Sequence, residues 1–252
     1  MIVKQLVNKE RKLLPRLGTR KLYYLIRSQL EVQEIKFGRD KLFALLSESG
    51  LLIKPQRRYI QTTMSKHWLR KWPNIIKGLT IKEPDQVWVS DITYIKTQEE
   101  NCYLNMVTDA YSRKIVGYAL DNNMEAESMI KALEMATKQK VNPLMQTIHH
   151  SDRGLQYCSK EYVQLTQKNN IKLSMTENSD PYENALAERM NRTIKEEFGM
   201  NRKLTNKKQL EEVLKESIIL YNSKRPHLAL NMKTPDDVYQ KKSRLPKAIG
   251  IN

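Results

Sequence analysis

The chain has 252 residues, 40% of them hydrophobic and 29% charged, a composition typical of a folded globular protein rather than a disordered one. No apolar run is long enough to cross a membrane, and Cys102 and Cys158 form neither a disulfide framework nor a zinc-binding spacing, so we expect a cytoplasmic protein. The formal net charge of +16 indicates a phosphate-rich partner such as nucleic acid.

The charge is unevenly distributed along the chain. Residues 1–83 contain 19 Lys and Arg against 6 Asp and Glu, and residues 201–252 contain 12 against 5. Residues 84–200 reverse the balance, with 13 against 17. A merely solvated basic surface would explain the two ends but not the acidic middle. The pattern therefore indicates basic arms around a centre in which carboxylates have another task.

Residues 1–53 predict three short helices. Apolar residues recur at helical spacing in "IVKQLVNKERKLL", "GTRKLYYLIRSQL" and "FGRDKLFALLSESG", the first stopped by Pro15 and the last by Gly50. Three basic helices of this size fit a helix-turn-helix DNA-binding domain, whose last helix would present Arg39 and Lys41 to a groove. Small basic three-helix units also bind proteins, so the pattern alone leaves both uses open.

Residues 54–83 lack a sustained period and are rich in Lys and Arg, which predicts a basic linker. Its aromatic residues Tyr59, Trp68 and Trp72 would suit stacking along nucleic acid. Aromatic residues in linkers more often pin the linker to the domain beneath it. We favour that role for Trp68 and Trp72.

From residue 84 the period changes to two, as in "VWVSDITYI", which predicts a strand. Strands follow in "YLNMVTDAYS" and "KIVGYAL", joined by a turn at Ser112 and Arg113. A helix over 125–140, a strand over 147–152, a helix over 160–169, a strand over 171–176 and a helix from about Pro181 complete residues 84–200. This order predicts a mixed five-stranded sheet with flanking helices, as in the RNase H-like fold. Within residues 201–252, an apolar stripe over 206–227 predicts a helix that packs on this core, followed by a basic tail.

Three acidic residues occupy positions that a surface charge would not need. Asp91 falls in the middle of the first strand, on the same side as Val87 and Val89, where an unpaired carboxylate would be costly. Asp152 ends the fourth strand. Glu188 lies off the apolar stripe of the helix from Pro181, on a face that also carries amides and cations.

Three carboxylates suit Mg²⁺ or Mn²⁺, two of which can activate an attacking oxygen and stabilise a leaving one in phosphoryl transfer. Simpler roles compete with this one. Asp152 would also cap a turn, and Glu188 would also pair with Arg192 four residues on.

Other candidates in this segment favour structural roles. Asp109 is expected to accept hydrogen bonds from the turn before Arg113. Strand alternation places His149 and His150 on opposite faces, where ordinary packing is favoured over metal binding.

Five segments, in this order, resemble insertion-sequence transposases of the OrfB type, the IS-three family, which carry a retroviral-integrase-like catalytic core. They are "DQVWVSDITYIKT", "MVTDAYSRKIVGYAL", "HHSDRGLQYCSKEY", "SMTENSDPYENALAERMNRTIKEEF" and "YNSKRPHLALNMKTPDDVY". The resemblance covers about residues 85–240, and "RLGTRKLYYLIRSQL" with "RDKLFALLSESGLLI" resembles the helix-turn-helix segment before the core. Each segment alone would be a weak signal, but five in order are specific.

The resemblance implies that Asp91, Asp152 and Glu188 are the DDE triad that binds two Mg²⁺ ions, with Mn²⁺ as a substitute. The 35 residues between the last two match the spacing typical of this group. Lys195 matches a basic residue that contacts transposon-end DNA in the family. Arg192 and Arg153 are expected to position backbone phosphates. The implied partners are double-stranded DNA, at transposon ends and target, and further copies of the chain on paired ends.

The expected function is therefore DNA transposition: cleavage at the transposon end, then strand transfer by the freed 3′-hydroxyl. Two alternatives are a nuclease that joins nothing and a DNA-binding regulator that has lost catalysis. The chain also begins later than many family members. A trimmed chain, an alternative start and a frameshift fusion to an upstream DNA-binding protein would each explain this.

Overall fold

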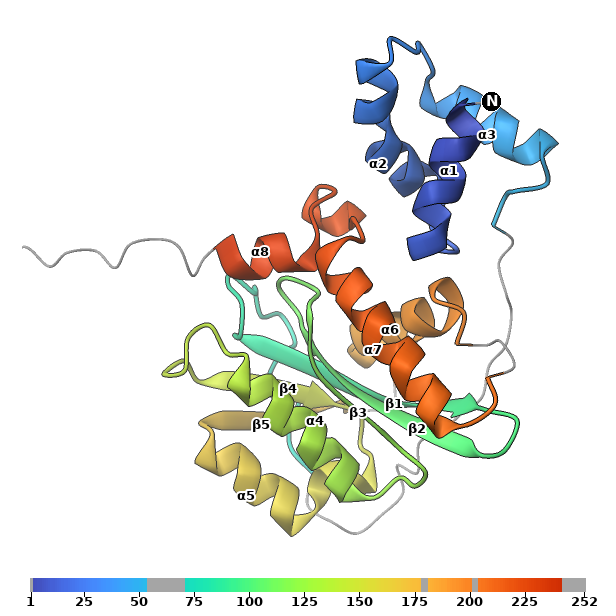
Figure 1. The fold of residues 1–252 in the computed structure, drawn as a ribbon. Helices are drawn as coiled ribbons and strands as arrows, with labels where there is room; N and C mark the ends of the chain where they lie inside the picture. The colour runs from blue at the N-terminus through green and yellow to red at the C-terminus, as the bar shows by residue number, and fades with distance from the viewer. Residues whose placement is uncertain (1, 54–70, 178–180, 201–203, 242–252) are drawn as a thin grey trace, which may run out of the picture.

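The computed structural model describes residues 2–53, 71–177, 181–200 and 204–241 (Figure 1). Three helices, α1 (Ile2–Leu13), α2 (Thr19–Val32) and α3 (Arg39–Glu48), form an N-terminal three-helix unit, as the sequence predicts. Their apolar stripes pack together, and this core contains the fully buried side chains of Val7, Leu22, Ile26, Leu42 and Leu46. None of the helices among the described residues is long and apolar enough to cross a membrane.

The rest of the described chain is built on a mixed five-stranded sheet. Its strands are β1 (Val87–Lys96), β2 (Asn101–Asp109), β3 (Ile115–Asp121), β4 (Thr147–Ser151) and β5 (Ile171–Met175), in the order β3-β2-β1-β4-β5. The first three pair antiparallel through tight turns, and β4 pairs parallel with both β1 and β5. Parallel neighbours need crossover connections. Helices α4 (Ala126–Lys138) and α5 (Lys160–Lys168) supply them.

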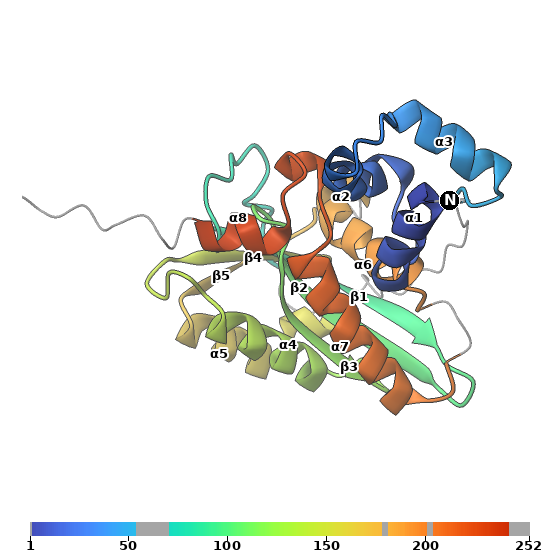
Figure 2. The ribbon, with the colours of Figure 1, turned by 45° about the horizontal axis from the view of Figure 1, so that its top comes forward.

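Helices cover both faces of the sheet (Figure 2). The even-numbered side chains of β1, such as Trp88 and Ile92, share an apolar cluster with α4 and α5. The odd-numbered ones, such as Val87, Val89 and Ile95, face the other side, where α6 (Ala185–Glu197) and α7 (Lys207–Ser223) pack. Asp91 belongs to this second set, so its carboxylate faces α6.

The C-terminal part of the chain differs from the prediction in three places. The helix expected from Pro181 begins as a 3₁₀ turn, η2 (Pro181–Asn184), and the helix predicted over 206–227 ends at Ser223. After the short turn η3 (Leu228–Leu230), a further helix, α8 (Pro235–Lys241), forms where no helix is predicted. Tyr239 explains it, because this side chain is buried and its hydroxyl donates to Asp85 Oδ1 at 2.7 Å. A seven-residue helix is stabilised by such tertiary contacts rather than by its own sequence.

Residues 71–83, the described part of the predicted linker, contain no helix or strand. Trp72 packs against the apolar cluster of α4 and α5, which confirms the expected pinning role for this residue. Tyr59 and Trp68 lie outside the described residues, as does the basic tail after Lys241.

Candidate active site

Asp91 is half-buried in the middle of β1 and has two hydrogen-bond donors. The backbone N–H of Ile92 donates to Oδ1 at 3.0 Å, and Asn191 Nδ2 on α6 donates to Oδ2 at 2.8 Å. Burial, together with the charges of Asp152 and Glu188, nevertheless raises the pKa of Asp91 to about 7. The two hydrogen bonds therefore do not fully offset the cost of burying the negative charge of Asp91. A cation bound beside this carboxylate would stabilise its ionised form.

Helix α6 lies on β1 with matched spacing. Two residues along a strand span about 7 Å, and four residues along a helix span about 6 Å. Asp91 and Thr93 therefore meet Asn191 and Lys195 pairwise, and Lys195 Nζ donates to Thr93 Oγ1 at 3.1 Å. Burial lowers the pKa of Lys195, while the charge of Asp91 acts in the opposite direction.

Asp152 directly follows β4, and the parallel register explains its position. Ser90 of β1 pairs with Ser151 of β4, so Asp91 and Asp152 are the next residues on neighbouring strands. Asp152 Oδ1 accepts a hydrogen bond from the backbone N–H of Gly154 at 3.0 Å. A Cβ on Gly154 would lie only 3.1 Å from this oxygen, so glycine permits the close approach. The carboxylate thus caps a turn and also faces the site, and the two interpretations of Asp152 are compatible.

Glu188 lies in the first turn of α6 with an exposed side chain. Partial desolvation of its carboxylate and the charge of Asp152 raise its pKa, and the charge of Arg192 acts in the opposite direction. The charge of Asp152 therefore acts on both Asp91 and Glu188, so the three predicted carboxylates lie within electrostatic range of one another. Within the described chain, no three His, Cys, Asp or Glu side chains already stand in metal-ligating positions, so these carboxylates are neighbours rather than a preassembled ligand set.

The predicted DNA-contacting residues divide between two places. Lys195 and Arg192 on α6 lie beside the carboxylates, and Arg153 follows Asp152 with its Nε donating to Thr176 O at 2.6 Å. Arg39 and Lys41 lie on α3, in the three-helix unit, and both are exposed (Figure 1). The structure therefore does not bring Arg39 and Lys41 to the carboxylate site.

Asn191 and Thr93 are site residues that the sequence analysis did not single out. Asn191 holds Asp91, and Thr93 holds Lys195. A signal for both was available, since Asn191 shares the polar face of Glu188 and Thr93 lies two residues after Asp91. The missing information was which strand this helix face would meet.

The structural roles expected for the two histidines and for Asp109 are confirmed. His149 Nε2 lies 2.7 Å from Ser90 Oγ and 3.3 Å from the Tyr162 hydroxyl, and burial lowers its pKa to about 3. His150 shares a hydrogen bond of 2.9 Å with Ser174 Oγ. Asp109 Oδ1 accepts hydrogen bonds from the backbone N–H and the hydroxyl of Ser112, at 2.7 and 2.5 Å.

The chain matches two protein-family models, both described as "Integrase core domain", over residues 82–181 and 169–235. The chain is 38% identical over 221 residues to "Insertion element IS600 uncharacterized 31 kDa protein" of Shigella sonnei, covering 86% of this chain and 81% of the relative. It is 32% identical over 179 residues to the transposase for insertion sequence element IS904 of Lactococcus lactis, covering 68% and 70%. Transposase InsF for insertion sequence IS3A of Escherichia coli is 32% identical over 170 residues, covering 67% and 59%.

Solved structures share the fold. The catalytic core domain of HTLV-2 integrase in complex with magnesium aligns with a TM-score of 0.51 and 19% identity, covering 62% of this chain and 97% of that chain. A chain of the simian T-cell lymphotropic virus intasome in complex with PP2A regulatory subunit B56 gamma aligns with a TM-score of 0.55 and 16% identity, covering 93% and 79%. These similarities confirm the predicted RNase H-like fold.

Proposed function

Because the chain belongs to the family of insertion-sequence transposases with an integrase catalytic core, we propose that Asp91, Asp152 and Glu188 are its catalytic carboxylates. The family is one of DDE polynucleotidyl transferases, and its function is DNA transposition and integration. Neither a nuclease without strand transfer nor a regulator without catalysis is favoured. The assignment of residues is supported by their placement: Asp91 and Asp152 follow the paired residues Ser90 and Ser151, and Asp91 contacts α6, whose first turn carries Glu188. Burial, and after it the charge of Asp152, raises the pKa of both Asp91 and Glu188.

The donor set fits divalent cations. All three side chains offer hard oxygen ligands, and the raised pKa of Asp91 indicates a place where positive charge is lacking. We propose Mg²⁺, with Mn²⁺ as a substitute and two ions per site, held by the three carboxylates. When bound, such ions supply activation of the attacking oxygen and charge neutralisation of the leaving oxygen.

The chain's own residues would orient the reacting groups. Asn191 and the Ile92 N–H hold the Asp91 carboxylate, and the Gly154 N–H holds that of Asp152, so both are preorganised. Lys195 would hold a phosphate oxygen of the DNA beside Asp91, with Arg192 and Arg153 holding neighbouring phosphates.

Two displacements would follow at this site. Water would attack a phosphodiester at the transposon end, forming a new P–O bond and releasing a free 3′-hydroxyl. That hydroxyl would attack a second phosphodiester in the target, releasing another 3′-hydroxyl, with no covalent protein intermediate.

The three-helix unit, residues 1–53, would bind transposon ends, residues 54–83 would link it to the core at 84–200, and residues 201–252 would pack on that core. Copies of the chain would assemble on paired ends. Fusion to an upstream DNA-binding protein by frameshifting is a further proposal, which sequencing of the flanking DNA would test.

Cleavage and strand joining on terminal-repeat DNA with Mg²⁺ test the site directly. We expect Asp152→Asn to lower both activities about a hundredfold or more, because several kcal/mol of charge stabilisation would be lost. Asp121→Asn, at the end of the edge strand β3, is the matched control and should retain activity. Wild-type activity in Asp152→Asn would remove Asp152 from the site. Wild-type protein that cuts but never joins would favour the nuclease alternative.

A further inference from the structure

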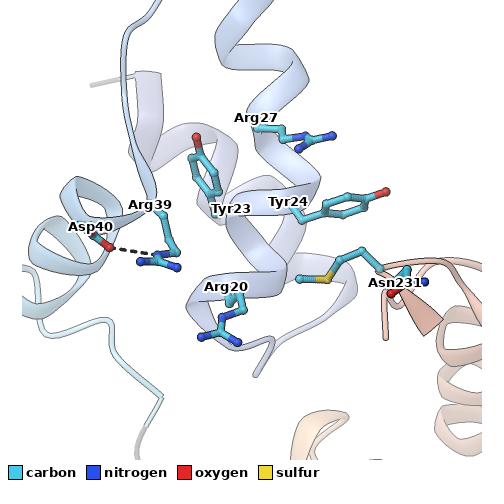
Figure 3. Close-up of a pocket in the computed structure, with 8 residues that line it drawn as sticks. Arg20, Tyr23, Tyr24, Arg27, Arg39, Asp40 and Asn231 are labelled. Carbon is cyan, nitrogen blue, oxygen red and sulfur yellow. Dashed lines mark hydrogen bonds and ion pairs between the residues drawn. The ribbon is translucent and has the colours of Figure 1, made fainter. Parts of the chain in front are cut away.

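A pocket of about 470 Å³ lies between the three-helix unit and the loop that follows η3 (Figure 3). Helix α2 and the start of α3 form one side of it, and the loop forms the other. The lining residues are Arg20, Tyr23, Tyr24, Arg27, Arg39, Asp40, Asn231 and Met232. None of them belongs to the carboxylate site, so the pocket needs its own explanation.

The pocket is strongly cationic. Arg20 and Arg27 are exposed on α2 and lie seven residues apart, which places them two turns apart on one helix face. Arg39 lies opposite them and pairs with Asp40 at 3.0 Å, an exposed ion pair that neutralises a single charge. Two guanidinium groups in excess, each with planar donors that match phosphate oxygens, favour a phosphate-bearing ligand.

The pocket also presents aromatic rings. Tyr23 packs partly against the apolar core of the three-helix unit, which holds its ring in place. Tyr24 contacts the guanidinium of Arg27, whose central carbon lies 5.1 Å from the ring centroid. Figure 3 shows these two side chains next to each other on α2. A tyrosine ring beside a guanidinium plane is a surface on which a nucleic-acid base stacks.

The loop wall is held in a strained conformation. Asn231 and Met232 have φ angles of 53° and 64°, in the left-handed region that Met rarely adopts. Hydrogen bonds enforce it: the Met232 N–H donates to His227 O at 2.8 Å, and the His227 N–H donates to Lys233 O at 3.1 Å. Strain of this kind persists where the surroundings over-determine it, often at ligand sites. The wall is therefore a fixed surface facing α2.

We propose that this pocket binds an unpaired nucleotide of the DNA that the protein processes, with its phosphate among the arginines and its base against Tyr24. The proposal rests on the proposed function, because it takes DNA as the substrate. Within a duplex the faces of the bases are covered by their neighbours, so a stacking site can use only a nucleotide that has left the stack. The pocket would thus recognise a frayed or single-stranded end.

Binding of fluorescently labelled DNA, measured by anisotropy with EDTA present, tests the pocket without involving catalysis. The two probes are a blunt duplex and the same duplex with a single-stranded overhang. We expect wild-type protein to bind the overhang probe more tightly. Tyr24→Leu should lose about tenfold in affinity for that probe, and Tyr24→Phe should keep it, because the ring supplies the stacking.

The arginines are tested by Arg20→Gln combined with Arg27→Gln. Lys9→Gln combined with Lys12→Gln is the matched control, with the same charge loss at exposed sites of the same unit. We expect the arginine pair to weaken binding of the overhang probe more than binding of the blunt probe, and to reduce the slope of log affinity against log salt for the overhang probe by about two. The lysine pair should leave both affinities nearly unchanged.

Three results would overturn the proposal. The first is equal wild-type affinity for both probes. The second is an unchanged overhang affinity in a folded Tyr24→Leu variant, and the third is equal losses in the arginine and lysine pairs, which would indicate general electrostatics. Wild-type protein that binds neither probe would count against DNA as substrate and so against both proposals. If only the pocket proposal fails, the proposed function still stands or falls with the Asp152→Asn cleavage test.

Discussion

Two aspartates on adjacent strands show how surroundings decide the role of a single residue. Asp109 accepts hydrogen bonds from the Ser112 N–H, the Ser112 hydroxyl and the Asp85 N–H, and it closes the turn to β3. Asp91 has two donors and lies near two further carboxylates. Burial raises the pKa of both, to about 6 and about 7 respectively. Only the surroundings of Asp91 offer several oxygen ligands to one cation, so the two residues have different tasks.

At this scale, Asp91→Asn should abolish cleavage and yet stabilise the protein. At pH 8 and without metal, the ionised Asp91 is desolvated and repelled by two carboxylates, so a neutral isostere should raise the free energy of unfolding by roughly 2 kcal/mol. Asp121→Asn should have the opposite sign, because Lys207 and Lys131 lie beside Asp121 and its pKa is lowered. Urea unfolding of both variants in EDTA measures this. A less stable Asp91→Asn variant would contradict the assignment.

His149 predicts a specific pH dependence of stability. Its pKa falls from 6.5 to about 3 on folding, so below pH 6.5 the unfolded chain takes up a proton that the folded chain does not. Stability should therefore fall as the pH is lowered from 6.5 towards 3, by roughly 1.4 kcal/mol per pH unit from this residue. His149→Gln removes the titrating group, and between pH 6.5 and 5 it should lose roughly 2 kcal/mol less than wild type. Urea titrations at several pH values give the free energy of unfolding of both proteins. If the wild type and His149→Gln lose the same stability as the pH falls, His149 is not held neutral in the folded protein.

At the scale of elements, close backbone approaches set the positions of the helices on the sheet. Asn191 and Lys195 tie α6 to β1, and the Asn184 side chain of η2 donates to Ser90 O at 3.0 Å. On the other face, α4 approaches β3 at Gly117, where the absence of a side chain lets the two backbones come together. These contacts fix the positions of α4 and α6 on the sheet.

Gly117→Ala should therefore be strongly destabilising. An added Cβ would lie 2.0 Å from Ala132 O and 2.9 Å from Ala136 N, both backbone atoms of α4, so the helix would have to move. We expect a loss of about 3 kcal/mol or more, or failure to fold. Gly18→Ala is the control, since its Cβ would meet nothing within 4 Å and its φ is −67°, and it should cost at most about 1 kcal/mol. Thermal unfolding of both variants measures the difference. Similar losses of stability in the two variants would contradict the close packing of α4 on β3 at Gly117.

At the scale of the whole molecule, segments that are separated in the sequence come together around α6. The basic three-helix unit and the segment after α7 lie on the same side of the sheet as α6 (Figures 1 and 2). Lys224 Nζ lies 3.7 Å from Glu10 Oε2, and Arg225 makes a bidentate pair with Glu197 at the end of α6, with N–O distances of 2.6 and 2.7 Å. The described parts of the two ends, residues 2–53 and 204–241, therefore lie against the acidic central region at α6.

This arrangement predicts a steep salt dependence of DNA binding. If basic residues from both ends contact at least about six phosphates, affinity for duplex DNA should fall about a thousandfold between 50 and 200 mM salt. Anisotropy titrations at several salt concentrations measure the slope, with sucrose at matched osmolality as the control. A slope of log affinity against log salt concentration near zero would show that the basic residues behind the net charge of +16 do not contact DNA phosphates.

Most of the helices and strands, the charge distribution and the family can be inferred from the sequence alone. Periodicity and turn residues are local, so twelve of the thirteen α-helices and strands that the structure describes were expected within a few residues of their bounds, and α8 is the exception.

Which residues contact one another became clear from the three-dimensional arrangement of the elements. The parallel register of β1 and β4 places Asp91 beside Asp152. The packing of α6 on β1 makes Asn191 the hydrogen-bond donor to Asp91. The tertiary structure also forms the pocket, because it places Met232 opposite α2. The physical reason is that hydrophobic periodicity indicates which face of an element is buried, but not which other element covers it. That choice depends on packing between segments far apart in the chain, and the contacts of the candidate site follow from it.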